Sequence, residues 1–380
     1  MNTELYITIE RSADALEQHI GAWNDLVGHA AEPNVFYEPH TLLPAWRHLA
    51  PPDLRIVLVW APNALPGRAP QLVGLFPITR RDRYSGLPIS VMATWQHLYS
   101  YLGTPLVRAR FASQVLQAFL AWLRTEGDAP LFECRSIRSD GAFYHALVET
   151  QNRLRFDVFH AARHTRACFV PAASADAYFE HSLSAKKLKE LRRQERRLAE
   201  LGHLAYDRSP GDLDTWIDEF VKLEATGWKG RGGTALQDDQ AALAMFRSYA
   251  HGAHTRRRWM ALALRIDGRA IAMKCNLLSG NGAVAFKIAY DESYARFSPG
   301  VLLEIEHVRL LHEGGAPAWM DSGAAADHPM IGPLWRDRIA IETIVVPTGR
   351  APGTFAVAAL PLLRWGARLA KRLFRWRKKS

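Results

Sequence analysis

The stretch that decides the fold begins with Ala283-Val-Ala-Phe-Lys-Ile-Ala-Tyr-Asp291, continues as Glu292-Ser-Tyr-Ala-Arg-Phe-Ser-Pro-Gly300, and ends in the apolar-striped segment Val301–His312. The first part predicts a strand and the last predicts a helix, with a short loop between them. The helix must then begin at the end of the strand. Unpaired N–H groups and the helix dipole at such an end favour a phosphate group.

Outward from this stretch, strand patterns and helix patterns alternate along the chain. Strands are predicted at Leu5–Ile9, Leu54–Trp60, Leu72–Thr79, Leu131–Cys134, Trp259–Ile266, Ala270–Leu278 and Ile339–Val346. Helices are predicted at Asp14–His29, Phe111–Arg124, Ala185–Leu201, Leu213–Thr226, Gln240–Ala250 and Pro299–His312. The sequence therefore predicts an α+β protein with mostly antiparallel sheets flanked by helices.

An internal repeat suggests two similar lobes. The strand–turn–strand unit over 54–79, whose turn holds Gly67-Arg-Ala, has a counterpart over 259–278, whose turn holds Gly268-Arg-Ala. Both units follow a predicted helix. We expect an N-terminal lobe over residues 1–165, a catalytic lobe over 166–350 and a separate basic tail over 351–380.

Composition narrows the class. With 48% hydrophobic and 23% charged residues, the chain can bury a core, and no apolar run is long enough for a membrane-spanning helix. Cys134, Cys168 and Cys275 are widely spaced, which favours neither a disulfide framework nor a metal site, and the N-terminus lacks a signal-peptide pattern. We therefore expect a cytoplasmic protein without a bound metal.

The formal charge of +10 is concentrated at the C-terminus. Eight basic residues and no acid lie between Arg364 and Lys379, so the remainder carries a net charge of only about +2. DNA binding is therefore not predicted. Trp365, Leu369, Leu373 and Trp376 share one helical face away from Lys371, Arg375 and Lys378. This pattern is typical of a helix in a membrane interface, although a helix docked on the body fits it equally.

Three segments together carry a resemblance to a known family. They are the basic run from Ala185 to Gly202, the run Tyr290-Asp-Glu-Ser-Tyr-Ala-Arg-Phe-Ser-Pro-Gly300, and Leu334-Trp-Arg-Asp-Arg338. The chain resembles the GNAT-superfamily acetyltransferases named after the cellulose-biosynthesis (CelD-like) proteins. The resemblance implies two GNAT-like lobes in tandem, related to the Fem-type aminoacyl transferases, and acyl transfer from a thioester such as acetyl-CoA or another acyl-CoA.

The resemblance also implies a donor site. The loop takes the place of the one that binds the pyrophosphate of acyl-CoA, which points to the consecutive residues Arg296, Phe297, Ser298, Pro299, Gly300 and Val301. Arg296 adds a charge-assisted contact. Pro299 supplies no N–H, so the grip on CoA differs from that of ordinary GNAT loops, and a carrier protein is an alternative thioester carrier.

Acyl transfer to an amine needs a base and an acid. Asp321 ends a predicted short strand and His328 follows in the next loop, so both are candidates for the base, and Tyr290 is a candidate for the acid. A turn-capping Asp321, a hydrogen-bonded loop His328 and a strand-end Tyr290 explain the same residues without catalysis.

The acceptor side is expected around Glu224-Ala-Thr-Gly-Trp-Lys-Gly-Arg-Gly-Gly-Thr234. Trp228 suits stacking, Lys229 and Arg231 suit an anionic group, and Glu224 and Lys287 are further acceptor-binding candidates. A helix end followed by a flexible connection is the plainer interpretation of this segment, and a solvent-facing strand lysine is the plainer interpretation of Lys287.

The expected function is N- or O-acyl transfer from acyl-CoA to a small molecule, a sugar or a polysaccharide precursor, without an enzyme-bound intermediate. A Fem-type transferase that uses charged tRNA and a non-catalytic GNAT-like module at the membrane are the alternatives. The plainer interpretation of the basic segment Ala185–Leu201 is a solvated helix face, and the alternative is a guide for CoA phosphates or an acyl carrier protein. Peripheral association with the inner membrane face would follow from the tail.

Overall fold

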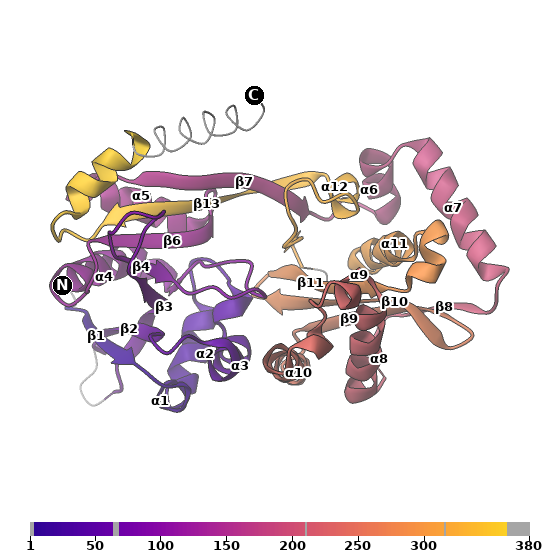
Figure 1. The fold of residues 1–380 in the computed structure, drawn as a ribbon, viewed down its shortest axis with the longest axis horizontal. Coiled ribbons are helices and arrows are strands. Elements are labelled where there is room, and N and C mark those ends of the chain that lie inside the picture. Colours follow the sequence, from indigo (N-terminus) through magenta and orange to yellow (C-terminus); the bar gives the residue numbers. More distant parts are fainter. Residues whose placement is uncertain (1–3, 64–67, 210, 315–316, 363–380) are drawn as a thin grey trace, which may run out of the picture. The chain divides into compact units, whose positions relative to one another are not determined.

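The computed structural model describes residues 4–63, 68–209, 211–314 and 317–362, and the chain divides into two compact units (Figure 1). Unit 1 comprises Met1–Asn34, Pro51–His164 and Ala340–Ser380, and unit 2 comprises Val35–Ala50 and Thr165–Ile339. Each unit is thus assembled from segments that are distant in the sequence. The tail helix predicted over 364–379 lies outside the described residues.

Unit 1 contains a mostly antiparallel sheet with the strand order β1-β2-β3-β4-β6-β13-β7. Within the described residues, β4 and β6 form a parallel pair, and helix α4 lies between these two strands in the chain. The strands are β1 (Tyr6–Glu10), β2 (Arg55–Ala61), β3 (Gln71–Arg81), β4 (Val91–Thr94), β6 (Leu131–Arg138), β7 (Phe159–Phe169) and β13 (Asp337–Pro347), while β5 (Leu106–Val107) pairs with β3.

Unit 2 repeats this plan with the order β7-β12-β11-β10-β9-β8. Its parallel pair is β11–β12, and helix α11 connects the two strands. The additional strands are β8 (Leu204–Asp207), β9 (Trp259–Ile266), β10 (Arg269–Ser279), β11 (Gly282–Tyr290) and β12 (Trp319–Asp321). The shared plan confirms the predicted α+β class and the internal repeat.

The strand that closes each sheet comes from the other half of the chain. In unit 1, β6 pairs with β13, which is the last strand in the sequence. In unit 2, β12 pairs with the end of β7, through Met320 with Phe169 and Asp321 with Cys168. The two halves of the sequence therefore exchange their closing strands.

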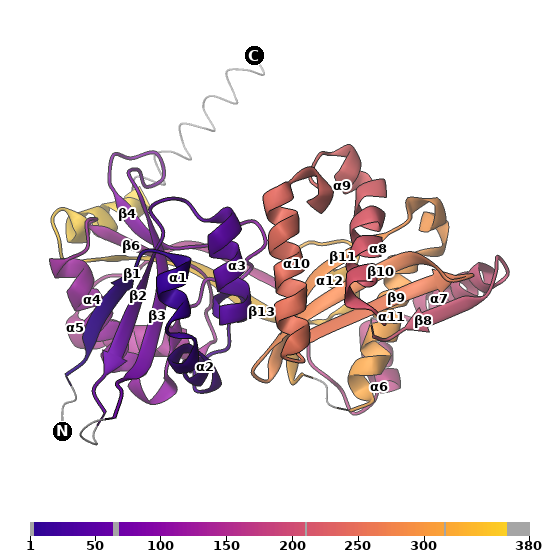
Figure 2. The same cartoon turned by 90° about the horizontal axis from the view of Figure 1, so that it is seen from below.

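Helices cover the sheets of both units. Figures 1 and 2 show α8 and α10 on one face of the unit 2 sheet and α11 on the other. The helices are α1 (Ala13–Glu17), α2 (Ile20–Gly28), α4 (Ala112–Thr125) and α5 (Ala142–Leu154) in unit 1, and α3 (Pro39–Leu49), α6 (Ala175–Ser182), α7 (Ala185–Ala199), α8 (Leu213–Thr226), α9 (Trp228–Arg231), α10 (Gln240–Thr255), α11 (Pro299–His312) and α12 (Ile331–Leu334) in unit 2. In the described part of the chain, none of them is long and apolar enough to cross a membrane.

Several helices begin where their sequence provides an N-cap. The side chains of Ser174, Ser184, Asp212 and Asp239 accept hydrogen bonds from backbone N–H groups in the first turns of α6, α7, α8 and α10. These N–H groups have no acceptor within their own helix, so each cap stabilises its helix by about 1 kcal/mol. The predicted helix Asp14–His29 is wrong as a single element. It divides into α1 and α2, and His19 at the break contacts Glu10 of β1 at 3.0 Å.

The beginning of the predicted tail belongs to the core of unit 1. Ala356, Val357 and Leu360 are buried in a cluster that also contains residues of β4, β6, β7 and β13. Burial of three apolar side chains stabilises unit 1 by several kcal/mol. Only a truncation beyond these residues can therefore leave unit 1 intact.

A buried carboxylate in unit 1 predicts a pH dependence. Glu32 Oε2 accepts a hydrogen bond from the N–H of Phe143 in the first turn of α5, and burial raises the pKa of Glu32 to about 7. Because the pKa is higher in the folded state than in the unfolded chain, this group lowers the stability as the pH rises from about 4.5 to 7. The free energy of unfolding of the Glu32→Gln variant, relative to that of wild type, should increase by up to about 3 kcal/mol between pH 5 and pH 8. Urea unfolding at both pH values tests this, and an unchanged difference between the two proteins would contradict it.

Candidate active site

The parallel strands β11 and β12 separate after a short pairing. They are paired at Gly282–Trp319, Ala283–Met320 and Val284–Asp321, where β12 ends, while β11 continues to Tyr290. In the described residues, no strand pairs with this side of β11 beyond Val284. The edge from Ala285 to Tyr290 thus presents backbone N–H and C=O groups to a ligand.

A bulge in β11 decides which side chains face α11. The register with β10 shifts between Cys275–Lys287 and Asn276–Ala285, so Phe286 is the extra residue. Ala283 and Ala285 therefore share the α11 face with Tyr290, although strict alternation would put Tyr290 on the other face. Lys287 instead faces α8, where it contacts Glu224.

The N-terminus of α11 lies at the end of β11. Ser298 adopts the left-handed backbone conformation, with φ at 54°, and Pro299 starts the helix. The N–H groups of Val301 and Leu302 both donate to the carbonyl of Ser298, while the N–H of Gly300 has no acceptor among the described residues. The helix end thus offers fewer free donors than the several predicted from the sequence.

Two predicted donor-site residues precede Gly300 in the loop. The guanidinium of Arg296 is exposed and lies 4.6 Å from the ring centroid of Phe297, which is buried in the core of unit 2. A Cβ atom on Gly300 would lie 3.4 Å from Met330 Sδ and 3.5 Å from Tyr290 Cδ1. Tyr290 and the loop after β12 therefore approach the same helix end.

His328 lies just before α12 and accepts hydrogen bonds from its first backbone N–H groups. Its Nδ1 accepts hydrogen bonds from the N–H groups of Met330 and Ile331, at 3.3 and 3.4 Å. An accepting Nδ1 fixes the tautomer with hydrogen on Nε2. In this arrangement the half-buried His328 offers a hydrogen-bond donor to a neighbouring group.

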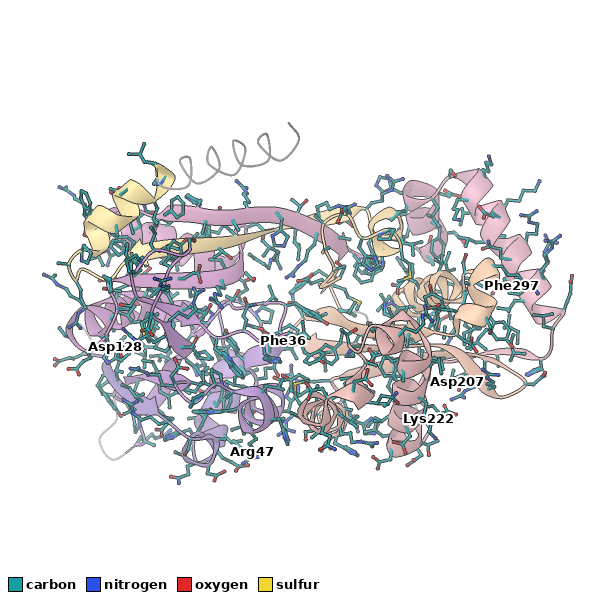
Figure 3. All side chains as sticks on the ribbon, in the orientation of Figure 1. Phe36, Arg47, Asp128, Asp207, Lys222 and Phe297 are labelled. Atoms are coloured by element: carbon teal, nitrogen blue, oxygen red, sulfur yellow. The ribbon has the colours of Figure 1, made fainter. Side chains whose placement is uncertain are left out.

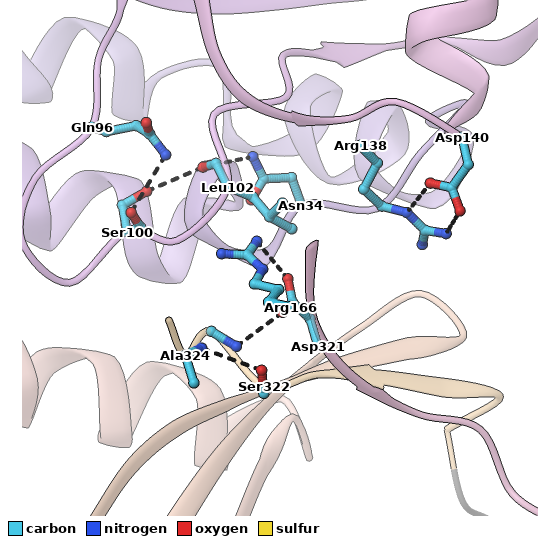
Figure 4. Close-up of polar contacts among 11 residues, drawn as sticks. Asn34, Gln96, Ser100, Leu102, Arg138, Asp140, Arg166, Asp321, Ser322 and Ala324 are labelled. Atoms are coloured by element: carbon cyan, nitrogen blue, oxygen red, sulfur yellow. Dashed lines mark hydrogen bonds and ion pairs between the residues drawn. The ribbon is translucent and has the colours of Figure 1, made fainter. Parts of the chain in front are cut away.

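Asp321 stands where β11 and β12 part, and it is fully buried. Its Oδ2 lies 2.6 Å from Nη2 of the buried Arg166, and its Oδ1 accepts the N–H of Gly323 (Figure 4). Six residues of β11, or about 20 Å, separate its partner Val284 from Tyr290. Asp321 and Tyr290 thus occupy opposite ends of the open strand edge.

Three predicted acceptor-side residues form one cluster. Glu224 Oε1 lies 2.8 Å from the Nζ atoms of both Lys229 and Lys287, and Oε2 accepts the N–H of Leu236. Burial alone would raise the pKa of Glu224, but the charges of Lys287 and Lys229 outweigh it and lower this pKa. Burial and the neighbouring Lys229 lower the pKa of Lys287. Lys287 therefore does not face solvent.

The loop after α8 also reaches the donor side. Arg231 Nη2 pairs with Glu292 Oε2 at 2.7 Å, and Gly227 approaches the carbonyl of Tyr290. Arg231 is exposed, so this contact costs little to break. Trp228 begins α9, and its side chain lies outside the part of the chain described.

A buried polar network was not predicted from the sequence. Lys274 of β10 contacts the Glu304 carboxylate and, at 3.0 Å, His307 Nδ1, and Asn276 Nδ2 lies 3.2 Å from His307 Nε2. All four side chains are buried beneath α11, with Lys274 also 5.3 Å from the ring centroid of Trp335. Burial lowers the pKa of Lys274. Glu304 and His307, one turn apart on the helix and both buried, were the available signal.

The predicted residues thus lie around the open edge of one strand, β11. Asp321 marks one end of the open edge of β11, the Glu224 cluster lies against its middle through Lys287, and Tyr290 with Gly300 marks the other end. No group of three or more His, Cys, Asp or Glu side chains in the described ranges is arranged to hold a metal ion.

Comparison with protein families identifies the site-bearing segment. Residues 185–328 match the family described as acetyltransferase (GNAT) domain. This segment is therefore similar to a GNAT acetyltransferase domain. The matched segment begins with α7, contains β11 and α11, and ends at His328, so it includes the site described above except for Arg166. The match supports acyl transfer as the chemistry of this segment.

Solved structures share the fold over nearly the whole chain. FemX is 10% identical, with a TM-score of 0.56, and the match covers 87% of this chain and 96% of FemX. A conserved protein of unknown function from Bacteroides thetaiotaomicron is 12% identical, with a TM-score of 0.51 and coverage of 90% and 100%. The C-terminal domain of a putative lysylphosphatidylglycerol synthetase from Agrobacterium fabrum is 13% identical, with a TM-score of 0.50 and coverage of 91% and 97%. A comparison with curated proteins gives no match.

Proposed function

We propose that the protein transfers an acyl group from a phosphopantetheine thioester, of which acetyl-CoA is the simplest, directly to an amine or hydroxyl of a small molecule, sugar or polysaccharide precursor. The observation that carries this proposal is the edge of β11 that opens at Val284–Asp321 and leads to the N-terminus of α11. A pantetheine arm contains two amides, which suit pairing with such an edge. Its phosphate would lie at Gly300 and Arg296, in the loop predicted for the donor.

This orientation assigns the reacting thioester to the other end of the edge. The acceptor nucleophile attacks the thioester carbon, the C–S bond breaks, and the acceptor loses a proton while the thiolate gains one. We assign proton removal to Asp321, held by Arg166 where the strands part. Tyr290 and His328 then serve the phosphate end rather than the thiolate.

The acceptor would approach from the α8 face. Glu224, Lys229 and Lys287 form a charged cluster there, and Arg231 of the short helix α9 pairs with Glu292, just after the end of β11. The Arg231–Glu292 pair costs little to break, since Arg231 is exposed, while Lys229 keeps α9 attached to Glu224. We therefore propose that the acceptor enters beside α9, and the CelD-like resemblance favours a polysaccharide precursor.

Transfer of isotope-labelled acetyl groups tests the function. Purified protein is incubated with labelled acetyl-CoA, or with acetyl-phosphopantetheine, and a cell metabolite extract, and heat-inactivated protein serves as the control. We expect labelled product in the mass spectrum only with active protein. Absence of product from every donor, together with absence of thermal protection by CoA, would overturn the proposal and favour a non-catalytic binding module.

A Fem-type aminoacyl transfer is the second candidate. It is supported by the similarity to FemX over both units, together with the basic helix α7. Protection of the protein from thermal unfolding by charged tRNA, without protection by CoA, would favour this candidate.

We also propose that residues 363–380 bind an anionic membrane surface through their Trp and basic residues. A truncation after Leu362 keeps Ala356, Val357 and Leu360, which the core of unit 1 needs. The truncated protein should keep its melting temperature and lose co-sedimentation with vesicles that contain phosphatidylserine. Undiminished co-sedimentation would rule out this role for the tail.

A further inference from the structure

The surface of α7 is the most strongly charged feature of unit 2. Residues 185–199 carry seven basic and two acidic side chains, whereas the rest of residues 166–338 carries 17 basic and 20 acidic ones. Six of the basic side chains are exposed, and none of these six forms an ion pair within the described residues. They are Lys186, Lys189, Arg192, Arg193, Arg196 and Arg197.

This helix lies directly beside the donor loop. Gln194 Nε2 donates to the carbonyl of Arg296 at 3.5 Å, and Figure 3 labels Phe297 of the same loop next to α7. Helical geometry places Lys186, Arg193 and Arg197 on the flank of Gln194 that faces away from the core residue Leu191. We call Lys186, Arg193 and Arg197 the basic stripe.

The donor loop has few groups that can bind phosphate. At the start of α11, only Gly300 has an N–H without an acceptor in the described structure, and Pro299 has none to offer. CoA carries a diphosphate and a ribose phosphate, so this loop has too few hydrogen-bond donors to bind all the phosphates of CoA tightly. The arm of a carrier protein has a single phosphodiester, which one N–H and Arg296 suffice to hold.

The length of α7 also favours a partner larger than CoA. Fifteen residues of helix extend over about 22 Å, far more than one diphosphate can contact. The exposed positions of α7 include no aromatic side chain on which a base could stack, which disfavours a single-stranded nucleic acid. Exposed cations without partners instead complement an acidic protein surface.

We infer that the basic stripe docks an acidic acyl carrier protein, whose phosphopantetheine arm delivers the thioester along β11. This inference rests on the proposed acyl transfer and names its donor. The attack breaks the C–S bond of the arm, and the thiol remains on the carrier. Docking on α7 supplies the affinity that the loop alone lacks.

The test compares two double variants of the same helix. Arg193→Glu with Arg197→Glu reverses the stripe, and Arg192→Glu with Arg196→Glu makes the same charge change on the solvent face. Binding of fluorescently labelled holo acyl carrier protein is measured by anisotropy at low and high salt, and acetyl transfer is measured from the acetylated carrier and from acetyl-CoA.

We expect the stripe variant to bind the carrier at least about tenfold more weakly at low salt, with the difference decreasing at high salt. Its kinetics with acetyl-CoA should stay within about twofold of wild type, and the control variant should keep most of its carrier binding. Three results would overturn the inference. They are equal losses of carrier binding in both variants, unchanged carrier binding in the stripe variant, and displacement of the carrier by tRNA. Failure of acetyl transfer from every donor would overturn the proposed function instead, because carrier binding is measured separately.

Discussion

Replacing Gly300 with Asp should reduce kcat/KM for acetyl-CoA at least about 100-fold, a loss of roughly 2.7 kcal/mol of transition-state stabilisation. The new carboxylate would lie at the second helical position of α11, where the proposed phosphate binds. A Cβ atom there would meet Met330, Tyr290 and Ile288 at 3.4 to 3.7 Å, which is ordinary van der Waals contact. An anion at a helix N-terminus also stabilises the helix, so the fold should persist.

The Gly300→Asn variant is the matched control, since it has nearly the same size and keeps the backbone N–H without the charge. We expect its kcat/KM to remain within about fivefold of wild type and both variants to melt within a few degrees of wild type. Titration calorimetry with CoA separates binding from turnover. Equal affinity of the Asp variant and wild type for CoA would refute the proposed phosphate position.

Replacing Lys274 with Met should reduce the free energy of unfolding by about 3–5 kcal/mol. The change leaves the fully buried carboxylate of Glu304 without its ammonium partner, and His307 alone cannot replace that charge. Guanidinium unfolding followed by tryptophan fluorescence at pH 7 measures the effect.

The double variant Lys274→Met with Glu304→Leu is the control for this prediction. It removes both charges, so it should recover most of the lost stability, because paired apolar replacements of a buried ion pair are often neutral. A single variant that loses less than about 1 kcal/mol, or a double variant less stable than the single one, would contradict the account.

The sequence allowed the elements with clear local patterns to be predicted. α11 begins and ends at the predicted residues Pro299 and His312, and β9 matches Trp259–Ile266. Periodicity and terminal residues set these boundaries. α3 and α5 were missed because Pro44 interrupts one and polar residues dilute the apolar face of the other.

The candidate site also contains residues that could be predicted from the sequence and residues that could not. The loop around Gly300 and the end of β12 at Asp321 were predictable, because a strand followed by a polar turn is visible locally. The partners of these residues were not. Arg166 and Lys274 reach their carboxylates through tertiary folding, across separations that no local pattern encodes.

The exchanged closing strands also constrain how the protein can be synthesised. About 200 residues separate the end of β6 from the start of β13, the strand that completes its sheet. At a ribosome speed of roughly 5–20 residues per second, β13 emerges on the order of 10–40 s after β6. Until then the nascent chain carries an unpaired edge at β6, so the N-terminal unit cannot finish folding before translation is nearly complete. A ribosome that stalls before Asp337 would leave a polypeptide that contains nearly all of unit 2 but lacks the strand that completes the sheet of unit 1.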